Sequence, residues 1–477
     1  MLNKPYTTRA QITSPFLVDV LIVVCIFVTA WTNPAHALTL VDAIEQALHN
    51  DPTYLAAQAN ADASRARSSQ AFARLMPQLT ASANTNDNRR DYFILSNRGN
   101  TLPERYNSHG TQVNFTQPLL HAEKYFALNQ AGLLVNQADY QFAAAEKDLL
   151  MRFAQAWLDI RQARDVVTAA DSRLQASQKE FDLARRALEK GVMSVAELEA
   201  AQAKRDQAQS EQVTAQTEHS LKLAVLEQII GSSDTPVSSV LSNRFSSLEP
   251  DQSTPEQWIA QAENGSPSIL AARRALDAAH QEVSRQRAGH LPTLDLIASY
   301  NNATQGYGLT GGQAGFRSTV NSVGVQLNLP LFSGGEQNAK VSEALAMRDK
   351  ASYELEATRR TTHLKIKQAW LTLKSSQARQ QSGKQSVKSA SIALKSAEAQ
   401  RAHGLKADLD VLQARQQRDE VLRDWNKARN DAVLNYLKLL AETGQLTGLD
   451  VLGMERKDSS VLPDEGLSTA VIEAHLQ

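Results

Sequence analysis

Four short segments of the chain alternate apolar and polar residues with a period of two. The alternation is clearest in the second half, at the apolar positions Leu294, Leu296, Ala298, Tyr300, Val323, Val325, Leu327 and Leu329. This period is typical of β-strands that are apolar on one face and polar on the other. We predict strands at about residues 78–88, 110–117, 293–301 and 321–329.

After each pair of predicted strands the chain contains no proline and has a period of seven. One series of large residues is Phe153, Ile160, Val167, Leu174, Phe181 and Leu188, and a small residue stands three positions after each of the first five. Heptads of this kind are typical of coiled coils, and small residues let helix axes approach closely. We predict coiled-coil helices at about residues 119–230 and 336–443, each interrupted by a turn at Gly191 or Gly404.

The two halves of the chain repeat the same order of elements. The residues that match, about 213 to 215 positions apart, are Pro52 and Pro267, Pro77 and Pro292, Pro118 and Pro330, Trp157 and Trp370, Gly191 and Gly404, and Gly231 and Gly444. A fixed offset between such residues indicates tandem structural units. We predict a first repeat over residues 38–231, a connector at 232–256, a second repeat over 257–444 and a C-terminal tail at 445–477.

The first 37 residues have the pattern of a secretory signal peptide. An apolar run from Val20 to Ala30 is too short to span a bilayer, and Ala35-His36-Ala37 provides small residues for cleavage after Ala37. The alternative is a membrane anchor that stays attached. Cys25 lies within this segment and follows Val24 rather than a small residue, so we do not expect lipidation. The mature chain would then contain no cysteine, as suits an exported protein without disulfides.

Composition excludes several classes of function. The chain has 50 Lys plus Arg and 51 Asp plus Glu, a formal charge of -1, which disfavours nucleic acid as a partner. Aromatic residues make up only 6%, as expected of closely packed helices rather than a thick core. The sequence contains no G-x-S-x-G, H-E-x-x-H or phosphate-binding-loop motif. We therefore expect no catalytic residues, no cofactor and no metal site.

Four amphipathic strands cannot close a sheet within one chain. They leave two open edges, and in a bilayer only a closed barrel satisfies the hydrogen bonds of strands. Three chains would supply twelve strands, an even number within the range of outer-membrane barrels. We therefore predict a mostly α protein with a small β part, trimerising into a 12-stranded β-barrel and an α-helical tunnel. The alternative is a structural or adhesive coiled-coil protein of the envelope without a channel.

Three segments of the chain resemble the TolC family of outer-membrane channel-tunnels. They are the sequence Gly-His-Leu-Pro-Thr-Leu-Asp-Leu beginning at Gly289, the turn from Arg401 to Leu412, and the turn from Lys190 to Leu198. The resemblance implies a homotrimer in the outer membrane of a Gram-negative cell, with its tunnel in the periplasm. It also implies a periplasmic adaptor protein and an inner-membrane transporter, of the ABC or RND class, as partners. The function implied is a passive exit duct for type I protein secretion, for efflux of small toxic compounds, or for both.

The resemblance also implies where a gate would lie. Asp410 matches the first of two acidic residues that narrow the tunnel mouth in the family, and Gln413 stands where the second acid would be. Lys406 falls at a basic latch position, Arg401 replaces a family tyrosine, and Glu197 matches their acidic partner. We expect Lys406 or Arg401 to pair with Glu197 across neighbouring coiled coils. The alternative for these charges is ordinary solvation at helix ends.

The two helix turns are candidate contacts for the adaptor protein. The residues concerned are Gly191, Val192, Met193, Ser194, Gly404 and Leu405. Each glycine also suits the backbone conformation of a tight turn, so its conformational role comes first and contact with a partner second.

Overall fold

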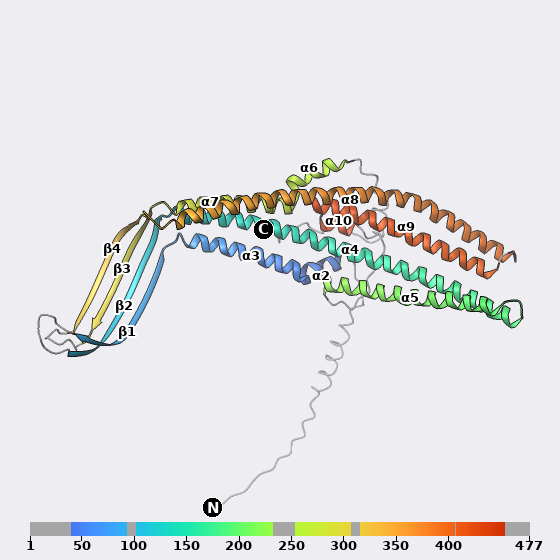
Figure 1. Ribbon diagram of the computed structural model, residues 1–477, viewed down its shortest axis with the longest axis horizontal. Coiled ribbons are helices and arrows are strands. Elements are labelled where there is room, and N and C mark those ends of the chain that lie inside the picture. The colour runs from blue at the N-terminus through green and yellow to red at the C-terminus, as the bar shows by residue number, and fades with distance from the viewer. Residues whose placement is uncertain (1–39, 93–101, 232–252, 307–314, 406, 454–477) are drawn as a thin grey trace, which may run out of the picture.

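The computed structural model describes residues 40–92, 102–231, 253–306, 315–405 and 407–453. The expected signal peptide, most of the expected connector and most of the expected tail lie outside these residues. The described part is long and narrow, with a four-stranded sheet at one end and two helix turns at the other (Figure 1).

The sheet is antiparallel and joins the two halves of the chain. Its strands, in their order across the sheet, are β1 (Gln78–Tyr92), β2 (Leu102–Leu120), β3 (Thr293–Gln305) and β4 (Phe316–Asn328). β2 pairs with β3 in a register that sets Phe115 opposite Ala298, so the central ladder connects the repeats. β1 and β4 are the two edges, and neither has a partner in the described chain.

Each strand extends beyond at least one of its two predicted boundaries, and only β4 ends one residue earlier than predicted. β1 and β2 continue into a polar region, where Arg105 bonds Asp87 at 2.6 Å and Asn88 donates to Ser108 at 2.8 Å. Side chains there are polar on both faces, so the apolar pattern ends before the strand does. Cross-strand polar pairs stabilise this outer part of the sheet instead.

Two helical hairpins form the long part of the molecule. Each pairs a long helix with a shorter return helix: α4 (Ala122–Glu189) with α5 (Val195–Ile230), and α8 (Glu336–Ala402) with α9 (Asp408–Glu442). The 68 residues of α4 are about 100 Å long at 1.5 Å per residue. Because α4 also packs on α9, the half nearer the turns has the lateral order α5, α4, α9, α8 (Figure 1).

The half nearer the sheet uses two further helices. These are α3 (Pro52–Ala73), which packs on α4, and α7 (Pro267–Ala288), which packs on α4 and α8. Both begin at a proline that matches between the repeats, and proline is tolerated in the first turn of a helix. Asp51 caps α3 by accepting a hydrogen bond from the Tyr54 N–H at 2.8 Å, as expected of a residue preceding a helix.

Small residues form the seams within the hairpins. Ala201, Ala208 and Ala215 of α5 are buried against α4 at heptad spacing. In the other hairpin, Gly383 of α8 faces Trp425, whose Nε1–H donates to the Gln380 carbonyl at 3.0 Å. The absence of a side chain at Gly383 makes room for the indole ring in this seam.

The largest apolar core lies where the return helices end. Phe153, Trp157, Leu226, Leu373 and Leu437 belong to this core. It is covered by three short helices that the heptad pattern did not reveal: α2 (Leu40–Asn50), α6 (Pro255–Gly265) and α10 (Gly448–Leu452). α10 lies within the expected polar tail, and its Val451 is fully buried in the core, so this part of the tail is a packed element.

Among the residues that the structure describes, no helix combines the length and apolarity required to cross a bilayer.

Candidate functional site

The turns that end the two long helices have the same backbone geometry. Gly191 and Gly404 have φ angles of 72° and 70°, a left-handed conformation that glycine adopts without steric cost. The following residues, Val192 and Leu405, donate their N–H groups to the carbonyls of Ala187 and Gln400, five positions earlier, at 3.0 and 2.9 Å. Both helices therefore end in a Schellman motif, which accounts for the glycines at this point of each repeat.

These turns expose apolar side chains at equivalent positions. Val192 is 77% exposed and Leu405 is 76% exposed, whereas Met193 is partly buried. The residue after a left-handed glycine often packs back on its own helix. Here both side chains point into solvent instead, which makes them available to a partner.

The two candidate acids occupy equivalent positions in the return helices. Glu197 is the third residue of α5 and accepts from the Ser194 N–H and hydroxyl, both at 2.8 Å. The hydrogen bond from the Ser194 backbone N–H, with that from its hydroxyl, lowers the pKa of Glu197. Asp410 is the third residue of α9 and accepts from the Ala407 N–H at 3.0 Å through Oδ2. Both acids therefore cap their own helix.

The predicted latch residues have partners of their own in the single chain. Arg401 approaches Asp408 across the turn at 3.4 Å, with both side chains more than half exposed. Glu197 accepts hydrogen bonds from Ser194, and the described side chains of one copy include no ion pair between Arg401 and Glu197. Gln413 is exposed one turn after Asp410. Lys406 lies outside the described residues. Pairing between copies stays a prediction.

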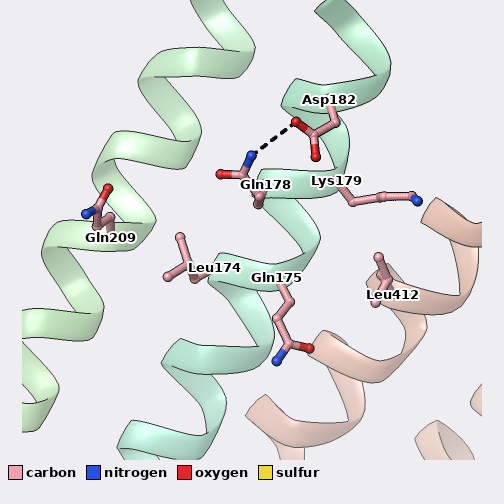
Figure 2. A pocket seen from close by; sticks show the side chains of 7 residues that line it. All are labelled: Leu174, Gln175, Gln178, Lys179, Asp182, Gln209 and Leu412. Carbon is pink, nitrogen blue, oxygen red and sulfur yellow. Dashed lines mark hydrogen bonds between the residues drawn. The ribbon is translucent and has the colours of Figure 1, made fainter. Parts of the chain in front are cut away.

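A shallow groove runs from the α5–α4 hairpin to α9 close to the turns (Figure 2). Its walls come from three helices: Leu174, Gln175, Gln178, Lys179 and Asp182 of α4, Gln209 of α5, and Leu412 of α9. Gln178 donates to Asp182 at 3.1 Å along one wall. Five of its seven lining residues are polar, and the groove is open to solvent, so it is suited to contact with a protein surface rather than to enclosing a small ligand.

Polar contacts also join the two hairpins to each other. Ser172 of α4 donates to Asp419 of α9 at 2.6 Å, and Asn426 of α9 donates to Asp165 of α4 at 2.9 Å. Asp419 is buried, and burial raises the pKa of Asp165. This polar seam was not predicted from the sequence, although Asp165 and Ser172 of α4 are seven positions apart, as are Asp419 and Asn426 of α9. It contrasts with the alanine seams inside the hairpins.

No set of described side chains is arranged for catalysis at the turns. Throughout the described part of the chain, no three His, Cys, Asp or Glu side chains are grouped so that they could hold a metal ion. The features that stand out are exposed apolar turn residues, exposed acids at helix starts and an open groove. These are features of a docking surface and of a charged opening.

The family follows from comparison with known proteins. The model of the outer membrane efflux protein family matches residues 43–232 and 258–445, one match for each repeat. The chain belongs to this family. It is therefore an outer-membrane efflux channel that extends into the periplasm, and not an enzyme.

Curated relatives cover nearly the whole of the chain. Alkaline protease secretion protein AprF of Pseudomonas aeruginosa is 28% identical over 429 residues, which cover 89% of this chain and 88% of AprF. Outer membrane protein TolC of Vibrio cholerae is 27% identical over 416 residues, which cover 87% of this chain and 93% of TolC. These matches confirm the resemblance to the TolC family.

Solved structures confirm the fold class. The CmeC outer membrane channel of Campylobacter jejuni superposes with a TM-score of 0.71 at 16% identity, covering 96% of this chain and 95% of CmeC. The outer membrane protein VceC of Vibrio cholerae superposes with a TM-score of 0.65 at 20% identity, covering 85% and 96%. Long helices with a small antiparallel sheet are thus the architecture shared with these channels.

Proposed function

We propose that three copies of this chain assemble into one channel. The observation that supports assembly is the pair of open edges on the sheet, β1 and β4, together with the outer helices α5 and α8 of the same copy. Pairing β1 of one copy with β4 of the next would satisfy the edge hydrogen bonds and close a barrel of twelve strands. The helices would then line a tunnel in the periplasm.

The channel serves as a passive exit duct for type I protein secretion. This assignment is supported by relatives whose names state protein secretion, among them AprF and the proteases secretion protein PrtF of Dickeya chrysanthemi, 26% identical over 454 residues. An inner-membrane transporter of the ABC class would supply the energy and select the substrate. A periplasmic adaptor protein would connect that transporter to the hairpin turns.

Efflux of small toxic compounds is the second candidate. It is supported by the description of the family and by the outer membrane efflux protein BepC of Brucella suis, 26% identical over 310 residues. A transporter of the RND class would then replace the ABC transporter. The duct itself would be the same, because the transporter chooses the substrate.

The gate of the channel lies at the two turns. Three copies of Asp410 would surround the opening and favour cations over anions. Gln413, one turn further along α9, would narrow the same opening without charge. Lys406 or Arg401 of one copy would meet Glu197 of the next, and exposed pairs of this kind contribute only about 0–1 kcal/mol each. Such weak pairs would suit a contact that has to open.

The adaptor protein contacts the exposed turn residues. Val192 and Leu405 would provide the apolar contacts, with Met193 and Ser194 beside the first. Gly191 and Gly404 would allow the backbone to turn and the adaptor to approach closely.

Secretion by a host that lacks its own exit duct tests the proposal. The host would carry a type I transporter, its adaptor protein and a protease substrate, with or without this chain. Protease in the medium only when the chain is present supports the secretion duct. If the protease stays inside while a dye is expelled, the efflux alternative is correct. If the chain reaches the outer membrane but neither the protease nor the dye leaves the cell, both proposed functions are contradicted.

A further inference from the structure

Helix α8 carries an unusual surface charge. From Ala357 to Ala397 it has nine Lys or Arg residues and no Asp or Glu. Four of them stand at multiples of seven, at Lys367, Lys374, Lys388 and Lys395, and all four are exposed. Each directly follows a seam residue, so they form one stripe along the helix, which we call the lysine stripe.

An exposed apolar row runs beside the lysine stripe. Leu364, Leu371 and Ile392 are each more than half exposed and also lie at multiples of seven. Residues at these positions point away from the seam with α9, where Ile366 and Leu373 are buried. The outer face of α8 therefore has the composition of a second coiled-coil seam without a partner in the described chain.

Helix α5, at the opposite side of the molecule, has the complementary charge. It carries six acidic residues and three Lys or Arg. Its face opposite α4 presents small exposed residues at heptad spacing: Ala203, Ser210, Thr217 and Ala224. Small residues in this position would admit the large apolar residues of α8 between them.

The spacing of charges agrees between the two helices. Asp206 and Glu227 of α5 are separated by 21 residues, and so are Lys374 and Lys395 of α8. α5 runs away from the turns and α8 runs toward them, so the two pairs would match in antiparallel order (Figure 1). Within the described part of the chain, neither Glu227 nor Lys395 forms an ion pair. Asp206 bonds only the adjacent Arg205 at 2.5 Å.

The two pairs also lie at matching heights along the molecule. Glu227 and Lys374 directly follow Leu226 and Leu373, which belong to the same apolar core. Near the turns, Gln209 of α5 and Leu412 of α9 line the same groove. Asp206 is one helical turn from Gln209, so it lies level with the first turns of α9. Val411, which is next to Leu412, packs on Leu394 of α8. Lys395 directly follows Leu394, so it also lies level with the first turns of α9.

We propose that the outer face of α8 packs against α5 of a neighbouring copy, with Lys395 opposite the neighbour's Asp206 and Lys374 opposite the neighbour's Glu227. The second copy is the occupant that matches the stripe in charge, spacing, direction and height. This inference rests on the proposed trimer and adds the contacts that set the helical register between copies. The heptad phases bring the lysine stripe and the acids to the same side of the interface.

Cross-linking tests the pairing directly. The variant Asp206→Cys/Lys395→Cys, treated with a short bifunctional maleimide, should give covalent trimers on a denaturing gel. The second variant, Glu227→Cys/Lys374→Cys, should do the same. The matched control is Asp206→Cys/Glu398→Cys, because Glu398 approaches Arg415 within its own hairpin at 3.7 Å and should give no covalent trimer.

Charge exchange provides a second readout. Lys374→Glu/Lys395→Glu should lose half or more of the detergent-resistant trimer, and so should Asp206→Lys/Glu227→Lys. The variant that combines all four changes should recover the trimer, because opposite charges again face each other. If the combined variant forms less detergent-resistant trimer than either double variant, the proposed pairing is wrong.

The mass of the unchanged protein separates this inference from the proposed function. A monomer in detergent, measured by light scattering, contradicts the trimer itself. A trimer whose two cysteine variants fail to cross-link contradicts only the α8–α5 pairing.

Discussion

Arg152→Ala is expected to destabilise the region where α3 begins against α4. Arg152 donates to both oxygens of Asp51, at 2.9 and 3.0 Å, and Asp51 is only 2% exposed. Removing one member of a buried ion pair leaves a buried charge and costs roughly 3–5 kcal/mol. Arg152 is 34% exposed, and Asp51 keeps its hydrogen bonds with Thr53 and Tyr54. We therefore expect a loss of about 2 kcal/mol after discounting for solvent.

The assay is urea unfolding of the helices, followed by far-UV circular dichroism at fixed protein concentration. A lower midpoint with an unchanged slope reports lost stability. Arg65→Ala is the matched control, because Arg65 also links α3 to α4 through Asp139 but both side chains are well exposed, at 54% and 42%. It should cost about 0–1 kcal/mol. A loss for Arg152→Ala no larger than that of the control refutes the reasoning.

A double variant isolates the role of the uncompensated charge. In Arg152→Ala/Asp51→Ser the buried carboxylate is gone, and serine is itself a favoured residue at the position before a helix, the position that Ser266 occupies before α7. It should be more stable than Arg152→Ala alone, by measurement of the same urea midpoint. An equal or lower midpoint would place the loss in packing rather than in the buried charge.

The same pair predicts a pH dependence of stability. The hydrogen bond from Arg152 lowers the pKa of Asp51 below its ordinary value of 3.8. A carboxyl group with a depressed pKa in the folded state stabilises the fold above its unfolded pKa, and this contribution is lost as pH falls through the folded pKa. The difference in midpoint between the natural chain and Arg152→Ala should therefore be constant above about pH 5 and shrink below about pH 4. A difference that grows on acidification contradicts this sign.

Four further substitutions test the turns and a seam. Leu405→Asp should abolish export while trimers remain in the membrane; loss of trimers would make Leu405 a folding residue. Gly404→Ala should lower the urea midpoint by about 1 kcal/mol, because alanine is strained at a φ of 70°. Gly383→Leu should cost about 1–3 kcal/mol by overpacking, since a Cβ there already lies 2.9 Å from the Trp425 ring, and Trp425→Leu should recover part of it.

Periodicity predicted the parts of the fold that repeat. The heptads gave the long helices because the seams of α4, α5 and α8 bury one side of each helix at regular spacing. Pro52 and Pro267 located matching points of the repeats, and each stands at a helix start because proline is tolerated in a first turn. The short helices α2, α6 and α10 were missed because five to eleven residues are too few to establish a period.

The candidate site was predictable in position but not in its contacts. The glycines located both turns, but the exposure of Leu405 does not follow from the turn motif, in which this residue often packs back on its own helix. The use of Glu197 and Asp410 as helix caps was not predicted, although both stand three residues after a helix boundary. The Arg401–Asp408 contact depends on how the turn folds back, which no period in the sequence encodes.

Planar-bilayer conductance of the detergent-extracted protein tests the central claim, a trimeric channel whose mouth carries Asp410. A multivalent cation is added on the side of the helical turns, and Asp410→Asn is measured beside the natural chain. The account predicts small, cation-selective steps that the added cation blocks, with weaker selectivity and weaker block in Asp410→Asn. Steps without cation selectivity, or selectivity and block unchanged in Asp410→Asn, would contradict it.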